Sequence, residues 1–125
     1  RESYRPFAPA VIDEKKHLYF EISRKEQFNY MEKVVKVKKN CQKKLQAITH
    51  LDGSARVQTV DKKDNKDFYN ILKEFEKLSN FPILLNTSFN ENEPIVFKPE
   101  EAIECILRTD LDAVFINNFL IKKSV

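Results

Sequence analysis

The strongest constraint on the fold is an amphipathic segment at residues 68–78 that leads, after two polar residues, into a short apolar run. Apolar side chains recur in the first segment at helical spacing, with charged residues between them: Phe68, Ile71, Leu72, Phe75 and Leu78. This spacing predicts a helix that buries one face, with Asp64 or Asn65 as its N-cap. Residues 81–85 predict a buried strand. We therefore expect the side chains of Phe75 and Leu85 to be buried.

The N-terminal third predicts extended segments around one short helix. Two prolines, at positions 6 and 9, favour an extended path at the start of the chain. Residues 13–20 predict a short helix with Asp13 as N-cap, which carries Leu18 and Phe20 inward. The alternation of valines at residues 30–37 predicts a strand. The lysine-rich residues 36–44 are typical of a solvated connection, with a phosphate-binding patch as the alternative.

The C-terminal third predicts a second helix and two closing strands. Pro99 is suited to the first position of a helix, whose inward residues we expect to be Ile103, Ile106 and Leu107. Residues 112–116 and 118–121 predict strands that turn at Asn117 and Asn118. Strands and helices thus mix without a regular repeat. We expect an α+β fold, an α/β sandwich in which helices pack on a mixed, largely antiparallel sheet.

Residues 45–60 predict a hairpin, because Asp52 and Gly53 separate two runs that read as strands. Gly53 is the single glycine of the chain, which indicates that a positive φ angle is required there. The register is open at this point. A two-residue loop would place Arg56 opposite Thr49, and a three-residue loop would place it opposite His50.

Composition limits the class of protein. The chain of 125 residues is long enough for a single domain with one core, and its formal net charge of +3 is too small for a dedicated nucleic-acid binder. No apolar run approaches the roughly 20 residues of a membrane-spanning helix. Cys41 and Cys105 lack the spacing of a metal site, so we expect two reduced thiols in a cytoplasmic protein.

Three polar segments carry the residue types that bind anions and amides. Arg1 and Arg5 are four positions apart, so on an extended chain they share a face and could clamp a phosphate; an ordinary surface pair is the alternative. A second group surrounds the predicted turn: His50, Ser54, Arg56 and Gln58. A third follows the strand at 81–85: Asn86, Thr87, Ser88 and Asn90. A structural histidine and a turn of hydrogen-bonding caps are the alternatives for these two groups.

These segments occur as RESYRPFAPAV, AITHLDGSARVQTV, and PILLNTSFNENEPIV followed by PEEAIECILRTDLDAVFINNFLI. In that order they resemble the C-terminal domain of the O-carbamoyltransferase family of nodulation and antibiotic-biosynthesis proteins. The similarity covers nearly the whole chain and is weakest from residue 15 to residue 44. Residues 1–125 would then be a single domain, the C-terminal fragment of a larger carbamoyltransferase, cut at its N-terminal edge.

The resemblance implies a YrdC-like fold that takes carbamoyl phosphate and ATP and forms a carbamoyl-adenylate. A larger N-terminal domain, absent from this chain and holding a metal ion, would move the carbamoyl group to an acceptor hydroxyl. ATP would be a co-substrate, accompanied by Mg²⁺. The isolated fragment would be inactive, and its partners would be these substrates and its own N-terminal domain. Neither a membrane nor nucleic acid is an expected partner.

Residue by residue, the family motifs match Arg1, Arg5, Arg56, Asn86, Ser88 and Asn90. We expect Arg56 and Ser88 to be catalytic. We expect the other matched residues to bind substrate, and with them His50 and Thr87 from the same segments. The full set is Arg1, Arg5, His50, Asn86, Thr87 and Asn90. No metal site is expected in this chain. Arg5, Arg56 and Ser88 should line one concave surface. The alternative functions are a YrdC-like nucleic-acid-binding domain and a docking domain without activity.

Overall fold

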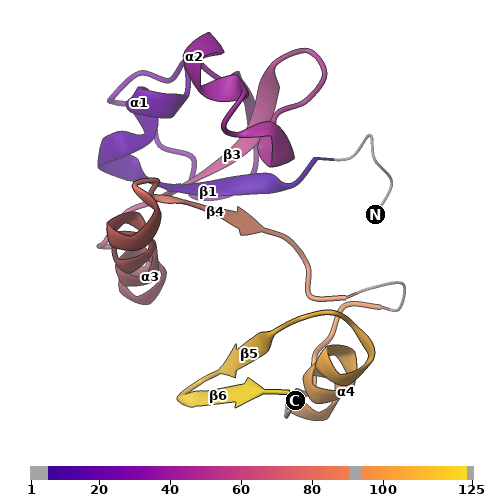
Figure 1. Cartoon of the computed structure of the whole chain (residues 1–125). Helices are drawn as coiled ribbons and strands as arrows, with labels where there is room; N and C mark the ends of the chain where they lie inside the picture. The colour runs from indigo at the N-terminus through magenta and orange to yellow at the C-terminus, as the bar shows by residue number, and fades with distance from the viewer. Residues whose placement is uncertain (1–5, 91–93, 124–125) are drawn as a thin grey trace. The chain divides into compact units, whose positions relative to one another are not determined.

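The computed structural model describes residues 6–90 and 94–123, and the chain divides into two compact units, Arg1–Thr87 and Ser88–Val125 (Figure 1). Arg1 and Arg5 lie outside the described residues. The expectation of a single domain stays a prediction. Across residues 6–90 and 94–123, no helix combines the length and the apolar character needed to cross a bilayer.

The larger unit is built on a four-stranded sheet with the order β2-β3-β1-β4. Its strands are β1 (Ala8–Ile12), β2 (Lys33–Lys36), β3 (Ser54–Val60) and β4 (Ile83–Asn86). β1 pairs with β3 in parallel, while the β1–β4 and β2–β3 pairs are antiparallel. The prediction of an α+β fold with a mixed, mainly antiparallel sheet is therefore confirmed for this unit.

One face of the sheet is covered by the short helices α1 (Lys16–Tyr19) and α2 (Lys39–Gln42), which lie together above it in Figure 1. Two 3-10 turns, Asp13–Lys15 and Gln46–Ile48, precede or follow these helices. The hydrophobic core on this side contains nine residues: Val11, Phe20, Ile22, Phe28, Val37, Ile48, Ala55, Val57 and Ile83. Five of these nine residues lie outside the strands of the sheet: Phe20, Ile22, Phe28, Val37 and Ile48.

The other face is covered in part by α3 (Lys66–Ser79), which lies on the opposite side of β1 from α1 and α2 (Figure 1). Asn65, one of the two N-caps predicted from the sequence, accepts a hydrogen bond from the Phe68 amide. Leu72 is fully buried and packs on the sheet with three residues: Ala10, Ile12 and Val60. α3 therefore covers the end of the sheet where β1 and β3 finish.

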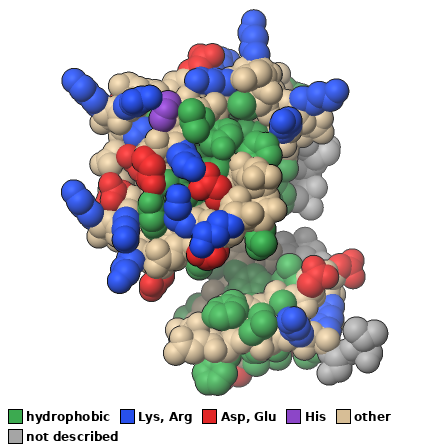
Figure 2. Space-filling model, turned by 60° about the vertical axis from the view of Figure 1, so that its left-hand side comes forward, with side chains coloured by type: hydrophobic (Ala, Val, Ile, Leu, Met, Phe, Trp, Pro, Cys, Tyr) green, Lys and Arg blue, Asp and Glu red, His purple; other side chains and the backbone are tan. Residues whose placement is uncertain are grey.

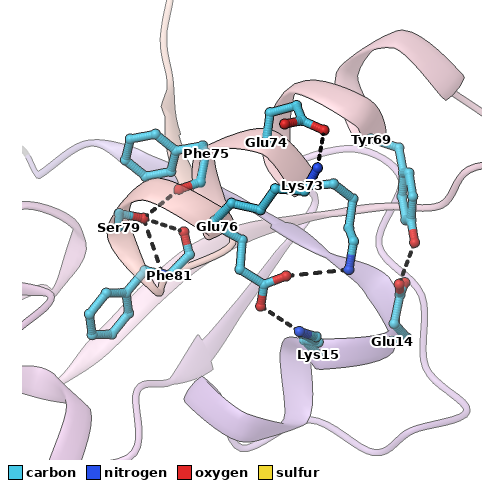
Figure 3. A network of polar contacts seen from close by, with 10 residues as sticks. Glu14, Lys15, Tyr69, Lys73, Glu74, Phe75, Glu76, Ser79 and Phe81 are labelled. Carbon is cyan, nitrogen blue, oxygen red and sulfur yellow. Dashed lines mark hydrogen bonds and ion pairs between the residues drawn. The ribbon is translucent and has the colours of Figure 1, made fainter.

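Polar contacts fasten α3 to the segment that follows β1 (Figure 3). The Glu76 carboxylate forms ion pairs with Lys15 and Lys73, and the pairing with Lys15 in particular holds the pKa of Glu76 below its usual value. The Tyr69 hydroxyl donates to Glu14, which raises the pKa of Tyr69 to about 12. The contacts with Glu14 and Lys15 join the surface of α3 to the segment after β1, in addition to the packing of Leu72.

The smaller unit consists of α4 (Pro99–Arg108) and a hairpin of β5 (Ala113–Ile116) and β6 (Phe119–Lys122). Pro99 stands at the start of the helix as predicted. The Glu101 carboxylate accepts from the Phe97 and Lys98 amides, at 2.9 and 3.2 Å, and so supplies the cap that Lys98 cannot. Asn117 has a φ of 51° at the hairpin turn, which confirms the predicted turn at this position.

The predicted hairpin at residues 45–60 is wrong in its first half. Only β3 is a strand, while Gln46–Ile48 forms a 3-10 turn that buries Ile48. Arg56 pairs with Val34 of β2, so neither of the two open registers occurs. The sharp turn itself is real, because Gly53 has a φ of 78° and donates to the His50 carbonyl. Leu45 and Ile48 are three residues apart, a helical spacing that the strand interpretation overlooked.

Several side chains predicted to be buried are exposed: Leu18, Ile71, Leu78, Leu85, Ile103 and Leu107. Leu85 is 49% exposed although it lies in a strand, because β4 is the edge of the sheet. α4 instead buries Ala102, Cys105 and Ile106, a face rotated from the predicted one. Phe75 is only partly buried, whereas Phe20 and Ile106 are buried as expected.

Candidate functional site

α3 packs on only one half of the sheet face on which it lies. Side chains alternate along a strand, so residues of even number in β1, β3 and β4 share this face, as the pairings of Ala10 with Gln58 and Leu84 confirm. We call the part packed under α3 the covered half: Ala10, Ile12, Val60 and Leu84. The remaining positions form the open half: Ala8, Ser54, Arg56, Gln58 and Asn86.

Two amide side chains meet across β1 in the open half. Asn86 Nδ2 donates to Gln58 Oε1, although β4 and β3 flank β1 and their backbones are about 10 Å apart. The contact is possible because β1 presents only the methyl groups of Ala8 and Ala10 beneath it. Gln58 is held from its other end, since its Nε2 donates to the Asn29 carbonyl at 2.9 Å. The result is a fixed pair of amides on an alanine floor.

Arg56 lies two residues before Gln58 on β3, so its side chain leaves the sheet on the same face. It is exposed, in contrast to its buried strand neighbours Ala55 and Val57. An exposed guanidinium beside two amides offers five donors to an anion and keeps its charge at any physiological pH. The open half therefore combines a fixed positive charge with groups that can both donate and accept.

The turn before β3 adds His50 to this end of the sheet. His50 Nδ1 lies 2.9 Å from Ser54 Oγ, which itself lies 2.6 Å from Asp52 Oδ1. The hydrogen bonds from Ser54 lower the pKa of Asp52 to about 2, and Lys36 reinforces the shift with an ion pair at 3.3 Å. Asp52 is thus an ionised acceptor at neutral pH, and it accepts from the Ser54 hydroxyl that contacts the imidazole.

A pocket of about 370 Å³ adjoins Gln58 on the same unit. It is lined by Asn29, Tyr30, Gln58, Thr59, Val60, Asp61, Asp64 and Asn65. Its volume falls in the range of small-molecule sites. Two carboxylates, those of Asp61 and Asp64, give the pocket a negative charge, opposite to that of Arg56. Hydrogen bonds orient both carboxylates, since Gln27 donates to Asp61 and Asn29 donates to Asp64.

Of the residues predicted from sequence, Arg56 and Asn86 lie on the same face of the sheet, and His50 lies in the turn before β3, where it contacts Ser54. Thr87 follows Asn86 and is exposed. Ser88 and Asn90 belong to the smaller unit, where Ser88 Oγ donates to Asn90 Oδ1 at 2.7 Å. The expected meeting of Arg5, Arg56 and Ser88 on one surface stays a prediction.

Gln58 is the residue that the prediction of site residues missed. The sequence placed it near the turn, yet nothing in a single chain shows that it reaches Asn86 across another strand. Its position two residues after Arg56 was the available signal, because the two side chains must then share a face. Among the described residues there is no cluster of three or more His, Cys, Asp or Glu side chains that could hold a metal ion.

Comparison with known proteins agrees with the resemblance seen in the motifs. The family model described as carbamoyltransferase C-terminus matches residues 1–123. Nodulation protein NolNO of Sinorhizobium fredii is 44% identical over 98% of this chain, and nodulation protein NolO of Bradyrhizobium diazoefficiens is 46% identical over 98%. Nodulation protein U of Azorhizobium caulinodans is 40% identical over 72% of the chain.

The matches cover most of this chain but only a small part of each relative. The chain covers 18% of NolNO, 23% of NolO and 16% of nodulation protein U, so it spans about a fifth of the length of these relatives. On the side of this chain, by contrast, the family model runs almost from end to end. The chain belongs to the carbamoyltransferase C-terminus family.

Proposed function

We propose that this chain binds carbamoyl phosphate and ATP and forms a carbamoyl-adenylate, as part of a longer carbamoyltransferase that passes the carbamoyl group to an acceptor hydroxyl. Carbamoyl phosphate, ATP and one water would give carbamoyl-adenylate, phosphate and pyrophosphate. The observation that carries the proposal is the open half, where Arg56 and the Gln58–Asn86 pair lie on one sheet face in a chain of the carbamoyltransferase family.

Arg56 suits the anionic part of this reaction. Carbamoyl phosphate and ATP bring several negative charges together, and a fixed positive charge offsets their repulsion without any change of protonation. A guanidinium can also hold two phosphate oxygens at once. Reactions of this kind depend on positioning and on charge stabilisation, which explains how a site without a side-chain nucleophile could be sufficient.

The amide pair suits the carbamoyl group, which presents one carbonyl oxygen and one NH₂. An asparagine side chain offers two donor and two acceptor positions, of which the contact with Gln58 takes one. We propose that Asn86 binds the carbamoyl group with the help of Gln58, and that Ser88 takes part in catalysis. A site that hydrogen-bonds an NH₂ discriminates strongly against analogues that lack it.

The pocket beside Gln58 suits the uncharged part of ATP. Carboxylates such as Asp61 and Asp64 accept hydrogen bonds from ribose hydroxyls but repel phosphates. Arg56 does the reverse. We therefore propose that the nucleoside occupies this pocket while its phosphates, with Mg²⁺ bound to them, point toward Arg56.

The location of the chemistry within the longer protein is also part of the proposal. Transfer to the acceptor would take place outside these 125 residues, so we expect the isolated chain to carbamoylate no acceptor.

Cys41 and Cys105 are both free thiols, which fits a reducing cytoplasm. An alternative role in nucleic-acid binding has less support, since the formal net charge is only +3 and, on the face that Figure 2 shows, Lys and Arg side chains are interspersed with Asp and Glu.

The test is carbamoyl-phosphate-dependent exchange of pyrophosphate into ATP by the full-length protein. We expect Arg56→Ala to lower the rate strongly and Arg56→Lys to restore part of it, because lysine keeps the charge but not the paired donors. Arg24→Ala, at an exposed arginine of the same unit, is the matched control and should behave as the wild type. Wild-type exchange by Arg56→Ala would refute the site, and absence of exchange from the wild type would refute the proposed reaction.

A further inference from the structure

The turn before β3 contains three polar side chains joined by hydrogen bonds, those of Asp52, Ser54 and His50. Ser54 Oγ is 2.6 Å from Asp52 Oδ1 and 2.9 Å from His50 Nδ1. Ser54 is only 4% exposed, so its hydroxyl has little access to water and is held between these two partners. The backbone fixes the same arrangement, because the Ser54 amide also donates to Asp52 Oδ1 and the His50 amide donates to the Ser54 carbonyl.

The protons of these three side chains can be assigned from their geometry. An ionised carboxylate only accepts hydrogen bonds, so at 2.6 Å the single proton of the Ser54 hydroxyl must point to Asp52. The oxygen of Ser54 then has only lone pairs to offer to His50. The contact at 2.9 Å is a hydrogen bond only if Nδ1 of His50 carries the proton. In the neutral imidazole, Nε2 is then without a proton and acts as an acceptor.

The imidazole is hydrogen-bonded to a residue on the same strand as Arg56. Ser54 and Arg56 are two residues apart on β3, so both face the open half. His50 is attached to Ser54 and is partly exposed. A phosphate group at neutral pH carries at most one proton, so its oxygens mainly accept hydrogen bonds. A nitrogen that only accepts therefore contributes little to binding a phosphate. It matches the NH₂ of a carbamoyl group.

We propose that Ser54 and Asp52 are positioning residues that hold His50 as the Nδ1–H tautomer, and that His50 Nε2 accepts a hydrogen bond from the NH₂ of carbamoyl phosphate. The second half of this statement rests on the proposed function, whereas the first half does not. His50 thereby distinguishes a carbamoyl group from an acyl group with a methyl in place of the NH₂.

The tautomer is measured directly by two-dimensional NMR of the protein labelled with ¹⁵N-histidine, at a pH above the usual imidazole pKa of about 6.5. The chain has two histidines, so the signals lost in His50→Gln identify His50. We expect a protonated Nδ1 and an unprotonated Nε2. Ser54→Ala should abolish this preference, whereas Ser23→Ala, in an exposed loop, should leave it. A protonated Nε2 in the wild type, or an unchanged tautomer in Ser54→Ala, would overturn the role of Ser54.

The ligand role is measured by the binding of carbamoyl phosphate and acetyl phosphate to the full-length protein. We expect the wild type to prefer carbamoyl phosphate, and His50→Phe and Ser54→Ala to lose about three- to tenfold of that preference while binding acetyl phosphate as before. Unchanged preference in both variants would overturn the ligand role of His50. If the wild type binds neither compound, the proposed function fails together with the ligand role, and the NMR result still decides the roles of Ser54 and Asp52.

Discussion

The covered and open halves of one sheet face are built from the same three strands but differ in what their side chains do. In the covered half, Ile12, Val60 and Leu84 pack under α3 with Leu72. In the open half, the same alternation presents Arg56 and the amide pair to the surface. A change of two residues along β3, from Gln58 to Val60, separates the two environments. The two halves share a backbone but use different side chains. A mutation in the covered half should therefore change stability, and a mutation in the open half should change ligand binding.

The largest expected effect on stability is in the covered half. Leu72→Ala should lower the free energy of unfolding by about 2–5 kcal/mol, because it opens a cavity at a fully buried position between α3 and the sheet. Ile71→Ala is the matched control on the same helix, at a side chain that is 56% exposed, and should cost much less. Urea denaturation of both variants measures the difference. Equal losses would mean that α3 does not pack on the sheet through Leu72.

The next largest effect is on ligand binding in the open half. Arg56→Ala should lose a charge-assisted hydrogen bond of roughly 1.5–3 kcal/mol to the bound anion, which is about a 10- to 150-fold loss of affinity for carbamoyl phosphate. The same variant should change the free energy of unfolding by no more than about 0.5 kcal/mol, since Arg56 is exposed. Titration calorimetry and urea denaturation separate the two. A strongly destabilised Arg56→Ala variant would break the division between the two halves.

A smaller effect is expected in the second unit. Ser88→Ala should reduce pyrophosphate exchange by the full-length protein less than Arg56→Ala does, because a neutral hydrogen bond is worth only about 0.5–1.5 kcal/mol. Steady-state exchange rates of the two variants provide the measurement. A larger loss for Ser88→Ala would show that the open half is not the main anion site.

The smallest effect concerns acid pH at the turn. The Asp52 carboxyl should titrate near 2, below its ordinary 3.8, chiefly because Ser54 donates to the charged form. Since the folded pKa is the lower one, this contribution to stability is complete above pH 3.8 and is lost as the pH falls through about 2. NMR titration of the carboxyl carbon should show Ser54→Ala moving the midpoint upward. An unmoved midpoint would mean that Ser54 does not donate to Asp52.

The sequence predicted the elements whose signals are local. The periodicity at 68–78, with a cap at Asp64 or Asn65, predicted α3, and Pro99 predicted the start of α4. Asn117 and Asn118 predicted the turn between β5 and β6. Each of these depends on residues within one or two turns of each other. The same local signal also identified the family, because the matching motifs are continuous segments.

Features that depend on distant residues could not be predicted. The wrong strand at 45–51 followed from an apolar pattern that fits a 3-10 turn equally well, and only β2, some 20 residues earlier, decides that β3 pairs elsewhere. The burial of Ile71 and Leu85 was overestimated because periodicity gives a face but not its neighbours. The Gln58–Asn86 contact joins residues 28 positions apart over two alanines, and no pattern in the chain indicates it.

The central claim is that the open half binds the carbamoyl substrate while the covered half holds the fold. A structure of the full-length protein with carbamoyl phosphate bound tests this claim most directly. We expect the phosphate within hydrogen-bonding distance of the Arg56 guanidinium, with the carbamoyl group toward Asn86 and His50. Carbamoyl phosphate bound elsewhere, with Arg56 still in solvent, would contradict it.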